Sequence, residues 1–289
     1  MNYFYLLLAM TFSATITVGG RLYNTKNKDR RNVSGLYNLL TPCSAALSWL
    51  VLWCLDFSFD AGVLPYSLLY GVGYSCFTVG VLGALNSGST ALTGLVKQLA
   101  LVGVSLWGFA FWGTEFTLLS GVGIVLIVIS LAMCLLTGKK EEKAGSLTKW
   151  LGYAALIVIG NAGCSIVQRY QQMAFDYQHK NMLMFFGVFF AFLFMLVLSR
   201  KEEKTDWAAA LRTTWPFPAL AGCSSAASNV FMLLLVKNRM SPVILYPGVA
   251  VGGLMITTLI SRFCFRERLR PMQWCGLAVG AAALVLLNL

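Results

Sequence analysis

Long apolar runs alternate with short polar stretches along the whole chain. The runs are roughly 20 residues long, which is the length that a helix needs to cross the hydrocarbon core of a bilayer. A transmembrane barrel would instead show short segments of alternating polarity, which are not seen. The pattern predicts an all-α polytopic membrane protein with ten transmembrane helices. Their expected ranges are 3–20, 33–55, 63–85, 88–112, 116–137, 150–172, 181–198, 214–236, 240–263 and 270–289.

Three connections between these runs are long and polar, at 21–32, 138–149 and 199–213. The middle one (GKKEEKAGSLTK) lies at the centre of the chain and separates two groups of five runs. We therefore expect a first five-helix unit at 1–137, a polar linker at 138–149 and a second five-helix unit at 150–289.

The two units resemble each other. Ser89–Glu115 aligns with Ser241–Glu267 without a gap, and Tyr5–Tyr23 aligns with Tyr153–Gln171. Two runs in corresponding places both begin at a proline followed by an aromatic residue, at Pro65 and Pro216. Because each unit has an odd number of spans, the second crosses the membrane in the opposite sense. The sequence thus predicts inverted repeats, a common plan of transporters in which the binding site lies between the repeats.

Each unit ends on the same succession of residues. FWGTEFTLLSGVGIVLIVIS and FRERLRPMQWCGLAVGAAALVLL both contain aromatic residues, a Glu, a short polar step and a Gly-bearing apolar helix. This paired signature resembles the drug/metabolite transporter superfamily, EamA type. The resemblance covers the whole chain and implies the fold and a transport function, but not the substrate. We assign structural roles to Glu115 and Glu267 at the starts of these helices, and to the small-residue pair Gly276 and Gly280 in the last one.

Composition agrees with a membrane protein and limits the possible partners. The chain is 58% hydrophobic and only 11% charged, with a net charge of +11. Its Lys and Arg lie mostly in the short connections, which is typical of membrane topology and contact with lipid headgroups rather than nucleic-acid binding. The eight Cys include no CxxC, so neither a metal nor another cofactor is expected.

Lys97 is the most informative single residue. It lies in the fourth run beside Gln98, about 12 Å from the expected helix start. An ionisable group at that depth is costly, so it faces the protein interior or water. One interpretation is a cation that binds an anionic substrate, and the other is a Lys that reaches the nearer headgroups or pairs structurally.

Arg169 is the second deep cation. It follows Asn161, Ser165 and Gln168 on one face of the sixth run. Small polar residues in membrane helices often serve interhelical packing, yet here they recur on several runs that line the central cavity in the family this chain resembles. The further candidate binding residues are Tyr74, Thr78, Ser13, Thr17, Ser225, Asn229 and Tyr246. Pro247 and Gly248, directly after Tyr246, form the best candidate hinge, because proline removes a helical hydrogen bond and glycine loosens the backbone.

These features favour a permease that moves a small polar metabolite by alternating access. An amino acid or another carboxylate-bearing or anionic metabolite is favoured because the deep charges are cationic, and export is the commoner direction in the family it resembles. No acidic residue lies at mid-membrane depth, which disfavours a cation/proton antiporter. No enzyme motif is visible. The alternatives are uptake of a neutral sugar or nucleoside, and a lipid-headgroup flippase or non-transporting scaffold.

The expected location is the cell (inner or plasma) membrane, with the lipid bilayer and a small-molecule substrate as partners. The connections after the first, third, fifth, seventh and ninth runs carry most of the Lys and Arg. The positive-inside rule places these connections in the cytoplasm and both termini outside, whereas the family resemblance implies termini inside. The sequence leaves monomer and homodimer open.

Overall fold

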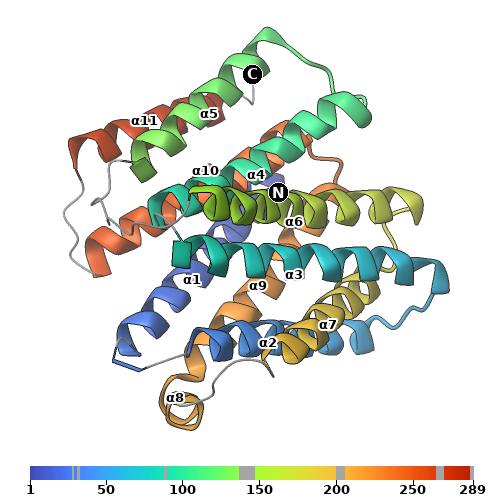
Figure 1. Cartoon of the computed structure of the whole chain (residues 1–289). Helices are drawn as coiled ribbons and strands as arrows, with labels where there is room; N and C mark the ends of the chain where they lie inside the picture. The colour runs from blue at the N-terminus through green and yellow to red at the C-terminus, as the bar shows by residue number, and fades with distance from the viewer. Residues whose placement is uncertain are drawn as a thin grey trace.

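The computed structural model is built of helices. It describes residues 1–27, 29–30, 33–87, 90–136, 147–199, 206–264 and 270–286. Within these ranges the regular elements are eleven α-helices and one short 3-10 helix, η1 (Figure 1). Their bounds are α1 (Asn2–Lys26), α2 (Ser34–Leu55), η1 (Ala61–Val63), α3 (Leu64–Ser87), α4 (Thr90–Phe111), α5 (Leu118–Leu136), α6 (Leu147–Ala174), α7 (Lys180–Ser199), α8 (Trp207–Thr214), α9 (Pro216–Lys237), α10 (Pro242–Cys264) and α11 (Pro271–Leu286).

The ten runs expected from sequence coincide with α1–α7 and α9–α11. Apart from the end of α1, the bounds agree to three residues or fewer. Three details of the prediction were wrong. Helix α1 continues to Lys26 instead of ending near residue 20, and α6 already begins at Leu147, inside the expected linker. The long polar connection at 199–213 contains most of an additional helix, α8, which the sequence did not predict and whose Ala210 is fully buried against α1 and α2.

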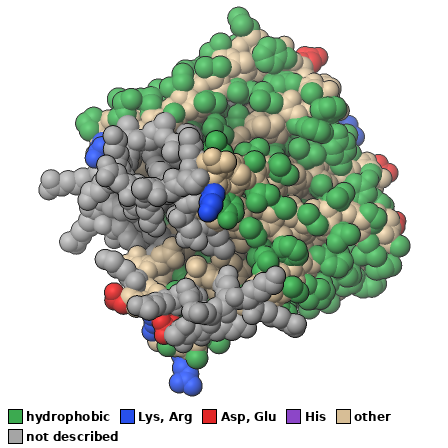
Figure 2. Space-filling model, viewed as in Figure 1, with side chains coloured by type: hydrophobic (Ala, Val, Ile, Leu, Met, Phe, Trp, Pro, Cys, Tyr) green, Lys and Arg blue, Asp and Glu red, His purple; other side chains and the backbone are tan. Residues whose placement is uncertain are grey.

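Within the part of the chain that the structure describes, six helices are long and apolar enough to span a membrane, as judged by length and composition. They cover Asn2–Lys26, Ser34–Leu55, Thr148–Ala174, Lys180–Ser199, Pro216–Lys237 and Pro242–Ile260. Shorter apolar stretches occur at Val96–Phe111, Leu118–Met133 and Pro271–Leu286. Figure 2 shows a broad hydrophobic surface with charged side chains at its margins, which is the distribution that a lipid-embedded bundle requires.

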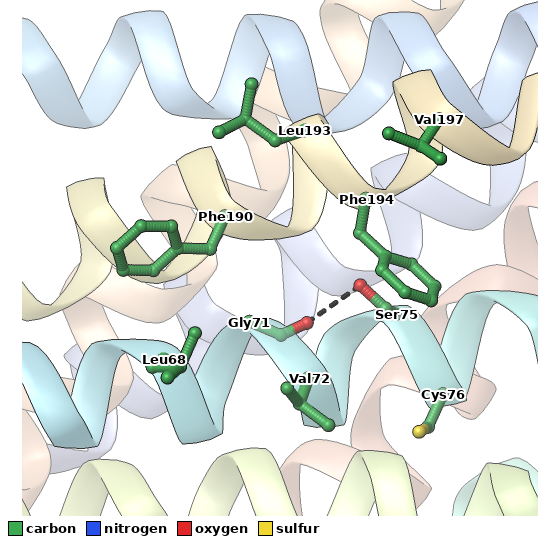
Figure 3. A pocket seen from close by; sticks show the side chains of 9 residues that line it. All are labelled: Leu68, Gly71, Val72, Ser75, Cys76, Phe190, Leu193, Phe194 and Val197. Carbon is green, nitrogen blue, oxygen red and sulfur yellow. Dashed lines mark hydrogen bonds between the residues drawn. The ribbon is translucent and has the colours of Figure 1, made fainter.

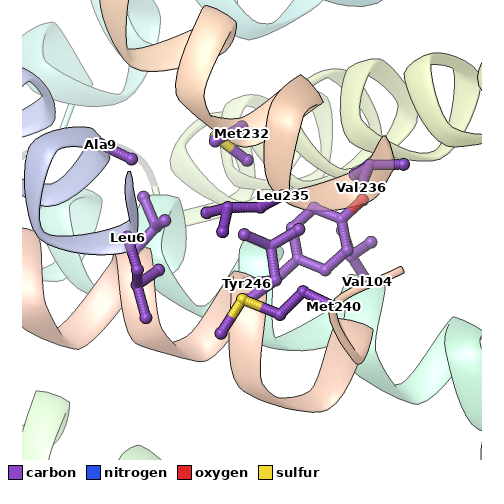
Figure 4. Close-up of a cluster of buried hydrophobic side chains, with 10 residues drawn as sticks. Leu6, Ala9, Val104, Met232, Leu235, Val236, Met240 and Tyr246 are labelled. Carbon is purple, nitrogen blue, oxygen red and sulfur yellow. The ribbon is translucent and has the colours of Figure 1, made fainter. Parts of the chain in front are cut away.

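The helices pack in pairs that join the first part of the chain to the second. Helix α1 packs on α9, α2 on α7 and α9, α3 on α6 and α7, and α4 on α10 and α6. Helices α5 and α11 pair with each other at the edge of the bundle (Figure 1). The central core includes Leu6, Met232 and Tyr246, and joins α1, α4, α9 and α10 (Figure 4).

Glycines permit the closest of these contacts. A Cβ on Gly71 of α3 would lie 2.9 Å from the carbonyl oxygen of Gly187 in α7. A Cβ on Gly222 of α9 would lie 2.3 Å from the carbonyl oxygen of Thr41 in α2. Real side chains do not approach backbone oxygens so closely, so only glycine allows these helices to touch.

The last helix of each group packs through a hydrogen bond and a small residue. Ser130 of α5 donates a hydrogen bond of 2.6 Å to the carbonyl of Gly276 in α11. A Cβ on Gly280 would lie 2.6 Å from the Ser130 hydroxyl and 2.8 Å from Val251 of α10. Gly276 and Gly280 therefore lie at contacts within the chain.

The start of α5 is capped by residues other than Glu115. Thr117 accepts a hydrogen bond at its side chain from the Ser120 backbone N–H at 3.1 Å, and the Ser120 hydroxyl accepts one from the Thr117 N–H at 3.0 Å. Glu115 precedes this pair and is exposed. The reciprocal Thr117–Ser120 contact thus caps α5, with Glu115 just before it, and Glu267 lies outside the described residues.

Candidate substrate-binding site

Lys97 lies where α3, α4 and α6 meet. Its side chain is partly buried, and its Nζ is 5.6 Å from the centre of the Phe77 ring of α3. The Nδ2 of Asn161 in α6 donates a 2.9 Å hydrogen bond to the Lys97 backbone carbonyl. Among the described residues no carboxylate forms an ion pair with this ammonium, so the aromatic ring is the partner that the structure gives it.

Helices α6 and α3, which each contact Lys97, carry further polar side chains. The Ser165 hydroxyl donates to the Asn161 carbonyl at 3.4 Å, and the Thr78 hydroxyl donates to the Tyr74 carbonyl at 2.9 Å. The Tyr74 side chain lies close enough to the side chains of Tyr37 and Cys164 to interact with them electrostatically. Gln98 is partly buried beside Lys97 on α4. The structure therefore brings Lys97 and Asn161 together, places Ser165 one turn beyond Asn161 on α6, and places Tyr74 and Thr78 on α3, the helix that carries Phe77.

Gln168 and Asn229 contact each other. The Gln168 Nε2 donates to the Asn229 Oδ1 at 2.9 Å and to the Met184 sulfur at 3.0 Å. The Asn229 Nδ2 in turn donates to the Ser225 carbonyl at 2.9 Å. Because these amides already have partners, their arrangement ties α6 to α7 and α9, which is the interhelical packing role weighed against ligand binding.

Arg169 lies further along α6, in an aromatic environment. Its Cζ is 4.7 Å from the centre of the Trp112 ring, at the end of α4, and its guanidinium lies beside the Tyr246 hydroxyl of α10. Tyr246 is fully buried and donates a 3.5 Å hydrogen bond to the Ser165 carbonyl. The Nε and Nη1 atoms of Arg169 are buried and have no hydrogen-bond partner. A desolvated cation in this state is costly.

The remaining candidates lie at the crossing of α1 and α10. Ser13 is partly buried, and its hydroxyl is 3.4 Å from the position that a Cβ of Gly253 would take, whereas Thr17 is exposed. Pro247 and Gly248 lie inside α10, which continues as a helix through them. The structure thus places the candidate hinge in the central core, where Gly248 faces Leu6 of α1.

Sequence reasoning missed the two aromatic partners of the cations. Phe77 lies on a different helix from Lys97, and Trp112 is far in sequence from Arg169. No spacing rule connects such pairs, because they meet only through the packing of α3 and α4 on α6. The described residues contain no group of three His, Cys, Asp or Glu side chains that could hold a metal ion.

Comparison with known proteins supports a membrane transporter. No protein-family model matches the chain. A stretch of 71 residues is 37% identical to the probable 4-amino-4-deoxy-L-arabinose-phosphoundecaprenol flippase subunit ArnE of Pseudomonas savastanoi pv. phaseolicola. The match covers 25% of this chain and 59% of that protein. A solved crystal structure aligns with a TM-score of 0.75 at 12% sequence identity, over 99% of this chain and 95% of that one, which shows the fold alone.

Together the apolar helices and the ArnE match define the class of protein. The similarity to a flippase subunit agrees with the resemblance read from the paired helix ends. The chain is a multi-pass membrane protein.

Proposed function

We propose that this protein is a transporter that moves a substrate with a compact anionic group by alternating access. The observation that carries the proposal is Lys97, a partly buried cation within the helix bundle that has no ion-pair partner among the described residues. A carboxylate or phosphate would supply the missing charge, and a charge-assisted hydrogen bond to it is stronger than a neutral one. Lys97 and Asn161 are the residues proposed to bind it.

The packing of the helices supports two inverted repeats, at 1–137 and 150–289, joined by a linker at 138–149. If α1–α5 are exchanged for α6, α7, α9, α10 and α11 in order, the α3–α6 pair becomes α9–α1 and the α3–α7 pair becomes α9–α2, both of which exist. Gly71 and Gly222 each lie six residues after the prolines Pro65 and Pro216, and each permits a close contact with the other group. Such symmetry suits a site that opens to either side in turn.

The anionic group could belong to a soluble metabolite, such as an amino acid, or to a lipid-linked headgroup. The sequence favours a soluble metabolite. A lipid-linked headgroup is supported by the similarity to a flippase subunit that acts on a phosphoundecaprenol-linked sugar. An apolar groove of about 300 Å³ between α3 and α7 also suits a lipid chain (Figure 3). Its Ser75 hydroxyl donates to the Gly71 carbonyl at 2.8 Å, so the groove wall stays apolar.

Transport by purified protein in proteoliposomes tests the proposal. We expect Lys97→Ala to reduce uptake of the anionic substrate about 10- to 100-fold, because a hydrogen bond to a charged group contributes about 1.5–3 kcal/mol. Lys97→Arg keeps the charge and should retain more activity. The matched control is Lys237→Ala, which removes an exposed lysine at the end of α9.

The substrates in this assay separate the two sources. One arm offers soluble amino acids and other carboxylates, and the other measures the flipping of a fluorescent lipid-linked phosphate. Loss of either activity in Lys97→Ala, but not in Lys237→Ala, supports the anion site and identifies its source. Transport of only neutral sugars or nucleosides, at equal rates in wild type and Lys97→Ala, would reject the proposal.

We further propose that the termini lie outside the cytoplasm and that the protein exports its substrate. The described charges at one side are Arg169, Lys180, Lys237 and Arg239, far fewer than those in the opposite connections. A tag fused to the N-terminus should be reachable by a membrane-impermeant reagent on intact cells. Labelling that needs permeabilised cells would contradict this orientation.

A further inference from the structure

Several buried polar atoms without hydrogen-bond partners lie near one end of the helix bundle. They belong to Arg169 and Gln172 on the last turns of α6 and to Trp112 just after α4. Arg169 lies eight residues beyond Asn161 on the same helix, about 12 Å along its axis. The group is thus separate from the contacts of Lys97, and what it binds can be tested independently of the proposed function.

Buried polar atoms without a partner are rare in folded proteins. Here three lie together, the Nε and Nη1 of Arg169 and the indole Nε1 of Trp112, whose ring stacks with the Arg169 guanidinium, and a fourth, the Oε1 of Gln172, lies one turn further along α6. Gln172 is one turn from Arg169, so their side chains share a helix face. Three of the four atoms are N–H donors, which an anion can satisfy and a cation cannot.

The donors are held in place by aromatic side chains. The guanidinium of Arg169 lies over the Trp112 ring, and the Trp107 indole N–H donates a 3.3 Å hydrogen bond to the Tyr170 hydroxyl. The Trp112 and Tyr170 rings meet edge to face at 5.8 Å. Tyr246 uses its own proton on the Ser165 carbonyl, which leaves its oxygen as an acceptor for Arg169. Such walls exclude water and strengthen electrostatic interactions inside them.

We infer that Arg169 and Trp112 form a second anion-binding site, for a carboxylate or phosphate group. The guanidinium and the indole are planar, and their N–H bonds lie in those planes and point away from the stacked faces. An oxyanion at the edge of the stack accepts from Arg169 and from the Trp112 N–H.

The site joins the two helix groups of the chain. Trp112 follows α4, whereas Arg169 and Tyr246 belong to α6 and α10. An anion bound to both partners favours the arrangement in which α4 and α6 stay together. Occupancy of the site therefore stabilises one conformation over another by the difference in its affinity for the two.

Thermal-shift titrations of the full chain in nanodiscs test the inference with acetate and inorganic phosphate as probes. At matched ionic strength with chloride, we expect a saturable rise in melting temperature in wild type. Arg169→Gln should weaken the response at least tenfold. Trp112→Phe keeps the aromatic face but removes the N–H, and should weaken it about 2- to 10-fold, the effect of one hydrogen bond.

The controls fix the origin of the response. Arg239→Gln removes an exposed arginine near the same end of the bundle and should respond like wild type. The titrations are repeated in the Lys97→Ala background, which removes the proposed transport site, and a response that is lost in Arg169→Gln should persist there. Arg169→Lys preserves a cation if Arg169→Gln fails to fold.

Nanodiscs made of two different lipids show whether the bound anion is a lipid headgroup or a free ion from solution. If anionic phosphatidylglycerol fills the site, the response to free phosphate is lost in nanodiscs of that lipid and kept in phosphatidylcholine, which also supports an anion site. An absent response in wild type with both lipids, or equal responses in wild type, Trp112→Phe and the Arg169 variants, overturns the inference. Arg169 would then be held by its aromatic stack alone.

Discussion

The two groups of five long helices share their packing residues but not their charges. Gly71 and Gly222 occupy corresponding positions and each permits contact with a helix of the other group. In contrast, the position that aligns with Lys97 is Val249, which is 4% exposed in the central core. The comparison teaches that the helix packing needs the glycines on both sides, whereas nothing in the packing needs a lysine. A residue that the architecture does not require, and that is costly to bury, is a good candidate for function.

The largest effect is expected from adding a side chain to the glycines at which the two helix groups touch. We expect Gly222→Ala to lower stability by about 1–3 kcal/mol, the usual cost of overpacking, because its Cβ would meet the Thr41 carbonyl and the Ser44 hydroxyl. Gly71→Ala should cost less, since its nearest contacts are longer. Melting temperature in detergent measures both. Gly152→Ala is the control, because nothing lies within 4 Å of its Cβ and its melting temperature should not fall. Equal stability of all three variants would contradict the packing role.

Reversing the charge of Lys97 tests whether this residue, which has no counterpart in the second helix group, interacts with the substrate. Lys97→Glu should reduce transport of the anionic substrate more than Lys97→Ala, since it adds repulsion to the loss of attraction. Glu at position 115 offers the matched case, because Glu115→Lys changes an exposed charge and should leave the rate near wild type. The measurement is the initial rate of substrate transport by each variant in proteoliposomes. A Lys97→Glu rate equal to that of Lys97→Ala would mean that the substrate does not approach this position as an anion.

Removing each aromatic partner tests the cation–π contact of Lys97 and that of Arg169 independently. Phe77→Leu removes the ring below Lys97, and Trp112→Leu removes the ring below Arg169. Each should lower stability by roughly 0.5–2 kcal/mol beyond the packing loss, the range of cation–π interactions. A double-mutant cycle of Phe77→Leu with Lys97→Met isolates that energy, and coupling near zero would show that the ring does not stabilise the ammonium.

The smallest expected effect is that of the hydrogen bond between α6 and α4. Asn161→Ala removes the 2.9 Å bond to the Lys97 carbonyl and should cost about 0.6 kcal/mol, the average for such bonds in membrane bundles. If Asn161 also binds substrate, the substrate concentration at half-maximal rate should rise severalfold. An unchanged value with a small loss of stability would leave Asn161 a packing residue only.

Prediction from sequence succeeded where local patterns dictate structure. Long apolar runs gave the ten long helices, because length and hydropathy alone decide whether a segment is helical in a membrane. It missed α8, whose eight residues are too short and too polar to stand out. It also did not identify the reciprocal Thr117–Ser120 hydrogen bonds that cap the start of α5.

The candidate site was predictable in its cations but not in its partners. The cost of a charge at membrane depth singles out Lys97 and Arg169 from sequence alone. Gln168 and Asn229, which looked equally available, hydrogen-bond each other across α6 and α9. Which polar side chains satisfy one another depends on distances between helices, and no spacing along the chain encodes those.

The sequence by itself thus determined the class of protein, the helices and the two deep cations, because each follows from the energetics of apolar and charged groups in a bilayer. Tertiary structure alone decided that Lys97 faces Phe77 and that Arg169 lies over Trp112 with buried N–H groups left unsatisfied. The physical reason is that a cation's need for a partner is local, whereas the partner is supplied by a different helix that only packing brings near.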